Sequence, residues 1–83
     1  MGAGIGFAPP AKRSVTIAGH ETSVSLEPMF WAALEQAARE SGQPLNALIA
    51  RIDAERLDAE RPPNLASAIR QWLFERRGRG GAG

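Results

Sequence analysis

Two short segments of alternating residues, joined by a glycine-containing turn, constrain the fold of this chain most. Within residues 14–26, apolar side chains alternate with serine and threonine on both sides of Gly19. The apolar positions are Val15, Ile17, Val24 and Leu26. This period of two predicts two strands, and Gly19 suits the tight turn of a hairpin. A hairpin this short is marginal in water, so helices or a second chain must cover it.

Three amphipathic helices are expected after the strands. Pro28 begins the first and Gly42 stops it, the second runs from Leu45 to Ala59, and the third runs from Leu65 to about Arg76 behind an Asn64 cap. The pattern predicts an α+β, mostly helical fold. We expect a flexible N-terminal arm at residues 1–11, one domain at 12–76 and a flexible Gly/Arg tail at 77–83.

The small size of the chain favours association. A chain of 83 residues buries only roughly 60% of its unfolded surface, near the limit of independent stability. Since it has no cysteine, disulfides and cysteine-based zinc sites cannot help it. Oligomerisation remains as the way to complete a core.

Composition argues against an enzyme. One histidine, no cysteine and no tyrosine leave few candidates for a nucleophile–base pair or a metal centre. We therefore expect no catalytic residue, no metal and no cofactor. The formal charge of +1 is nearly neutral, but the two ends are basic and the middle is acidic. With neither a secretory signal nor a membrane-spanning stretch in the sequence, a cytoplasmic protein without a membrane partner is expected.

The order of the segments resembles a known family. Residues 23–34, SVSLEPMFWAAL, carry a strand that leads directly into a proline-started helix, as in the ribbon-helix-helix DNA-binding proteins. Further stretches, KRSVTI at 12–17, LNALI at 45–49 and NLASAIR at 64–70, resemble a bacterial subfamily with a longer ribbon and an additional helix. The resemblance covers about residues 12–76.

The resemblance implies a homodimeric transcription regulator that inserts a β-ribbon into the DNA major groove. Higher oligomers stay open, as does whether the first strand pairs within the chain or across the dimer. The outward ribbon positions carried over are Lys12, Ser14, Thr16, Ser23 and Ser25, and the helix N-termini that could hold a phosphate are those at Asn46 and Asn64. His20 in the turn can reach a phosphate or a backbone carbonyl.

Two further interpretations accompany these expectations. Lys12 and Arg13 either clamp phosphates or form a solvated basic pair that protects an edge strand from aggregation. The expected interface with a second copy or another partner comprises Val24, Leu26, Trp31, Ile69, Arg70, Trp72 and Phe74. Trp31 and Trp72 lie in helical apolar stripes, typical of core residues, whereas Phe74 falls on a polar face. An alternative function is therefore a dimeric interaction or assembly module with weak or no sequence-specific DNA binding.

Overall fold

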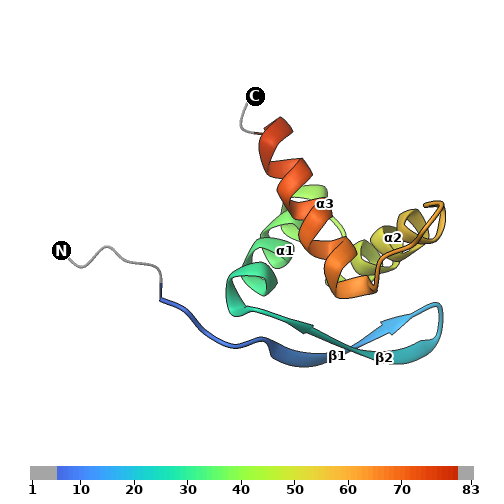
Figure 1. The fold of residues 1–83 in the computed structure, drawn as a ribbon, viewed down its shortest axis with the longest axis horizontal. Coiled ribbons are helices and arrows are strands. Elements are labelled where there is room, and N and C mark those ends of the chain that lie inside the picture. Colours follow the sequence, from blue (N-terminus) through green and yellow to red (C-terminus); the bar gives the residue numbers. More distant parts are fainter. Residues whose placement is uncertain (1–5, 81–83) are drawn as a thin grey trace.

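A two-stranded sheet and three helices make up the fold of this computed structural model, which describes residues 6–80 (Figure 1). The elements are β1 (Ala11–Ile17), β2 (His20–Leu26), α1 (Pro28–Ser41), α2 (Leu45–Leu57) and α3 (Leu65–Gly80). All three helices lie on one side of the sheet, and its other side is open (Figure 1). The α+β ribbon and three helices expected from the sequence are confirmed.

The two strands pair within the chain as an antiparallel hairpin. Its two-residue turn has positive φ at both positions, 52° at Ala18 and 81° at Gly19, which matches the right-handed twist of the flanking strands. The register places Ile17 opposite His20 and Ala11 opposite Leu26. Of the two pairings that the sequence left open, the structure has the one within the chain.

The core is built from all five elements of one chain. The inner face of the ribbon contributes Val15, Val24 and Leu26, which pack against buried side chains of the helices. The helical members are Trp31, Leu34, Ala37, Ala38, Leu48, Ile49, Ile52, Ala68, Ile69 and Leu73. The hairpin, too slight to stand alone, is thus covered by helices of its own chain.

Helix ends follow local chemistry, with two differences from expectation. Gly42 at φ 68° ends α1 in the left-handed conformation, as expected. Helix α2 ends at Leu57 rather than Ala59, because the N–H groups of Asp58 and Ala59 bond three residues back in a tighter turn. Helix α3 continues to Gly80 rather than ending at about Arg76, so it includes two glycines, Gly78 and Gly80, although glycine disfavours helix.

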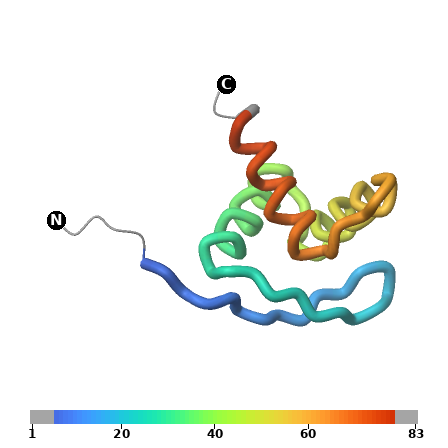
Figure 2. Tube along the Cα trace, viewed as in Figure 1, coloured from blue at the N-terminus to red at the C-terminus, as the bar shows by residue number. Residues whose placement is uncertain are grey.

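Regular secondary structure extends slightly beyond residues 12–76 at both ends. Residues 77–80, expected in the tail, are helical, and Ala11, expected in the arm, begins β1. Residues 6–10 run away from the body without regular secondary structure (Figure 2). The remainder of the expected arm (1–5) and tail (81–83) lies outside the described residues. Within the described part of the chain, no helix is long and apolar enough to cross a membrane.

Candidate nucleic-acid interface

The outer face of the ribbon is a continuous polar surface. Its cross-strand pairs are Lys12 with Ser25, Ser14 with Ser23, and Thr16 with Glu21, and all six residues are exposed. Because side chains alternate across a strand, the buried residues Val15 and Val24 fix these neighbours on the opposite face. The structure therefore brings together the five outward positions expected from the sequence, Lys12, Ser14, Thr16, Ser23 and Ser25.

The dimensions of this face suit a DNA groove. A two-stranded ribbon fits the major groove of B-DNA. The pairs that begin with Lys12 and Thr16 are four residues apart along β1, roughly 13 Å, which corresponds to about four base pairs. Hydroxyl groups between them can donate to or accept from base edges.

Charge is distributed unevenly along the outer face. Lys12 lies at the end near the arm and Glu21 at the end near the turn. A phosphate is attracted by the first and repelled by the second. The set of outward residues expected from the sequence did not include Glu21. The two-residue turn could have identified it, because a turn that pairs Ile17 with His20 also pairs Thr16 with Glu21.

Arg13 lies on the inner face and does not join Lys12. Its guanidinium carbon is 4.6 Å from the centroid of the Trp31 ring, and its Nη1 donates to Glu35 Oε2 at 2.8 Å. The alternation of the strand separates two sequence neighbours that were expected to act as a pair. Arg13 connects β1 to α1. Among the strand residues that the structure describes, Lys12 alone presents a cation on the outer face.

His20 is exposed at the turn end of the ribbon, but its position opposite Ile17 is on the inner register. It does not extend the row of outward hydroxyl groups. In residues 6–80, no group of three or more histidine, cysteine, aspartate or glutamate side chains is arranged to hold a metal ion.

The two asparagines at helix N-termini differ in their bonding. Asn64 Oδ1 accepts a hydrogen bond of 2.8 Å from the backbone N–H of Ser67, so it caps α3. Asn46 is exposed in the first turn of α2, and the residue before that helix, Pro44, makes no side-chain cap bond. The start of α2 therefore has the freer backbone N–H groups.

The residues expected at an interface fall into two groups. Val24, Leu26, Trp31 and Ile69 are at most 3% exposed because they pack in the core of their own chain. Arg70 and Trp72 are half-buried, and Phe74 is 80% exposed. The expected set thus mixes core residues with surface residues, because apolar periodicity alone does not distinguish a core stripe from an interface.

Arg70 links α3 to the ribbon-to-helix junction. Its guanidinium donates twice to Glu27 Oε1, at 3.1 and 3.0 Å, and lies 5.7 Å from the centroid of the Phe30 ring. A hydrogen bond with the backbone at Glu27, and after it the bond from Arg70, lower the pKa of the Glu27 carboxyl below 4.5. A charged Glu27 therefore helps to hold the third helix against the residues that end the ribbon.

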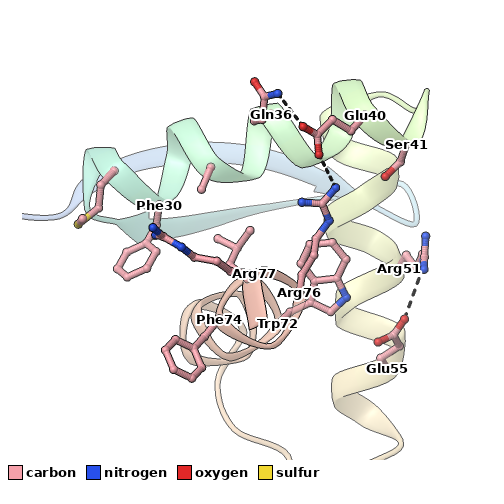
Figure 3. A pocket seen from close by; sticks show the side chains of 13 residues that line it. Phe30, Gln36, Glu40, Ser41, Arg51, Glu55, Trp72, Phe74, Arg76 and Arg77 are labelled. Atoms are coloured by element: carbon pink, nitrogen blue, oxygen red, sulfur yellow. Dashed lines mark hydrogen bonds and ion pairs between the residues drawn. The ribbon is translucent and has the colours of Figure 1, made fainter. Parts of the chain in front are cut away.

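A groove of about 1060 Å³ opens between α1 and α3, and Arg51 and Glu55 of α2 line one end of it (Figure 3). We call it the α1–α3 groove, and the lining residues used below are Met29, Phe30, Ala33, Leu73, Phe74 and Arg77. The sequence analysis singled out only Phe74 among them as a surface residue. The exposure of Met29 was missed because it occupies the first turn of a helix with a strong apolar stripe.

The comparisons with known proteins agree with this architecture. The profile of the ribbon-helix-helix domain family matches residues 10–76, which is most of the chain. Neither curated proteins nor solved structures yield a match. Domains of this family are generally DNA-binding transcription regulators. With its two-stranded ribbon, its three helices and this match, the chain belongs to the ribbon-helix-helix domain family.

Proposed function

We propose that the protein is a homodimeric DNA-binding transcription regulator that places the outer face of its ribbon in the major groove of duplex DNA. The observation that carries this proposal is the polar outer face, with Lys12 at one end and hydroxyl groups along its length. The helices cover only the opposite face, so the ribbon is free to approach a duplex. A bacterial regulator of this kind acts in the cytoplasm.

The unpaired edges of the ribbon support the proposal of a dimer. Each strand of a two-stranded sheet has one edge whose backbone N–H and C=O groups lack a partner in the sheet. Adding the ribbon of a second copy satisfies these groups and widens the polar surface. Ser14 and Ser23 then contact base edges while Lys12 contacts a phosphate. The freer N–H groups at the start of α2, beside Asn46, are a second candidate contact for the phosphate backbone.

A salt titration of duplex binding tests the proposal. The logarithm of affinity should fall linearly with the logarithm of salt concentration, and Lys12→Ala should reduce the slope by about one per chain. Arg61→Ala is the matched control, because it removes an exposed cation from the loop after α2 and should leave the slope unchanged. Absence of duplex binding by the wild-type protein at low salt contradicts the proposal.

A second candidate function, an interaction or assembly module, is favoured by the exposure of Phe74 beside the α1–α3 groove. In that case Phe74→Ala abolishes capture of the partner protein while duplex affinity stays unchanged. If Phe74→Ala changes neither capture of the partner protein nor duplex affinity, the second candidate is wrong.

A further inference from the structure

The α1–α3 groove combines an apolar floor with exposed apolar walls. Phe30 and Leu73 line it, and Met29 and Phe74 beside them are 61% and 80% exposed. Figure 3 shows Phe30 and Phe74 projecting from the two helices on the same side of the groove. Exposed apolar side chains are common singly, but two large ones at one hollow are typical of a docking surface.

The charge that remains unneutralised at this groove is positive. Arg76 bonds Glu40 at 2.6 Å, and Arg51 contacts Glu55 at 3.5 Å, so these four charges cancel in pairs. Arg77 extends toward Phe30 (Figure 3), and among the described residues it has no ion-pair partner. An occupant with an apolar side chain and an adjacent acid would satisfy both the groove and Arg77.

The same chain carries such an element at the C-terminal end of α2. Leu57, the last residue of α2, is 58% exposed. Asp58 and Glu60 follow it, both exposed, and within residues 6–80 neither carboxylate has a hydrogen-bond or ion-pair partner. We call Leu57, Asp58 and Glu60 the Leu57 knob. It presents one large apolar side chain flanked by two acids.

The knob cannot fill the groove of its own chain. Leu57 follows Glu55, which lines the groove, by two residues, so it projects about 200° away around the helix. Figure 1 shows the end of α2 on the opposite side of the molecule from the start of α1, where Met29 and Phe30 lie. A contact between knob and groove therefore requires two copies.

We propose that the Leu57 knob of one copy docks in the α1–α3 groove of a second copy, with Leu57 against Phe74 and Met29 and with the two acids near Arg77. This contact is heterologous, because the two copies contribute different surfaces, and it repeats head to tail. It uses neither the edges nor the outer face of the ribbon. The contact therefore stands whether or not the chain binds DNA, and it leaves the ribbon free.

A mixing experiment tests the contact on the full chain. In sedimentation velocity, the wild-type protein should form species larger than those of Leu57→Ser or Phe74→Ser, each of which weakens association by about tenfold or more. Both side chains are mostly exposed, so the variants should fold normally, which circular dichroism verifies. Ala47→Ser, on an exposed position at the other end of α2, is the matched control and should associate like the wild type.

The decisive sample mixes the two variants. Leu57→Ser retains an intact groove and Phe74→Ser retains an intact knob, so one copy of each should form a two-copy complex that neither variant forms alone, although this complex cannot extend further through the same contact. If the mixture forms no such complex, while each variant is impaired, the contact is symmetric and the proposal is wrong. The proposal is equally overturned if the wild type shows no assembly beyond that of Leu57→Ser, or if Phe74→Ser reduces assembly and Leu57→Ser does not.

Charge exchange provides an independent test. Arg77→Glu should weaken association, and mixing it with a copy that carries Asp58→Arg and Glu60→Arg should restore it. Raising the salt concentration should weaken the wild-type contact, because exposed charges are screened. If neither salt nor charge exchange changes the strength of association, the acids do not pair with Arg77.

Discussion

The guanidinium of Arg13 stacks over the indole ring of Trp31, with 4.6 Å from its carbon to the ring centroid. The same guanidinium pairs with Glu35 at 2.8 Å, so one side chain joins the first strand to the first helix. Lys12, its neighbour in sequence, is on the opposite face of the ribbon. The contact that joins strand to helix and the proposed contact with DNA thus belong to two adjacent cations.

This division predicts different phenotypes for the two cations. Arg13→Ala should lower the free energy of unfolding by roughly 1 kcal/mol, because it removes a cation–π contact and a half-exposed ion pair. Lys12→Ala should leave stability within about 0.5 kcal/mol. Urea denaturation measures both values. An unchanged midpoint in Arg13→Ala would show that the contact with Trp31 contributes nothing.

The buried indole of Trp31 should be more important for stability than that of Trp72. Trp31 Nε1 donates to the Ala11 carbonyl oxygen at 2.8 Å, and the residue is 1% exposed. Trp31→Phe should cost roughly 2 kcal/mol, because it removes this bond and leaves a cavity. Trp72→Phe is the matched control at a half-buried site and should cost less than about 1 kcal/mol. Equal losses in thermal unfolding would refute this ranking.

The hairpin turn offers a stabilising substitution. Ala18 adopts φ 52°, a left-handed conformation that is unfavourable for alanine. Ala18→Asn should raise the free energy of unfolding by about 0.5 to 1 kcal/mol, because asparagine before glycine is preferred in this turn. Gly19→Ala, at φ 81°, should have the opposite effect. Chemical denaturation of both variants checks the prediction, and destabilisation by Ala18→Asn would contradict it.

The two asparagines should respond differently to alanine. Asn64→Ala removes the cap of α3 and should cost about 1 kcal/mol in unfolding free energy. Asn46→Ala removes no observed side-chain bond and should remain within about 0.5 kcal/mol. Helical circular dichroism during thermal melting measures both. A similar loss at the two positions would mean that Asn64 is not acting as a cap.

Acid should weaken the attachment of α3 to the ribbon junction. The pKa of Glu27 is lowered from 4.5 by a hydrogen bond with the backbone at Glu27 and then by the Arg70 guanidinium. Because the pKa is lower in the folded state, the stabilisation is present above 4.5 and is lost as pH falls through the folded value. Glu27→Gln should flatten the dependence of stability on pH in this acidic range.

Titration of the side-chain carboxyl carbons by NMR measures this pKa directly. Replacing Arg70 with alanine should raise the pKa of Glu27 toward its ordinary value. Glu40 is a useful comparison, because its pKa is lowered chiefly by the bond from Arg76 and then by that from Gln36. It should not respond to the change at Arg70. A Glu27 pKa unaffected by Arg70→Ala would exclude the ion pair as a cause.

Sequence periodicity was sufficient to predict the strands and helices and to identify the residues on the outer face of the ribbon. Val15 and Val24 identify the inner face, and alternation then places Ser14 and Ser23 outside without any tertiary information. Pro28 and Gly42 mark the bounds of α1 because proline and glycine act through local backbone geometry. Such signals depend on neighbouring residues alone, and for this reason they can be read directly.

Features that depend on distant residues could not be predicted in this way. Arg13 was expected beside Lys12, although strand alternation places it on the inner face with Val15. Its contacts with Trp31 and Glu35, which lie 18 and 22 positions along the chain, could not be predicted from local periodicity. Trp31 and Ile69 were expected at an interface because an apolar stripe is the same whether its own chain or another covers it. Only the packing of α3 against the other elements separates these cases.

The two-residue turn at Ala18 and Gly19 also has a consequence for the proposed association of copies. Because the hairpin and its helical cover come from one chain, the described core is assembled from the residues of a single subunit. In the proposed association, two copies therefore join as folded units and can separate again without unfolding.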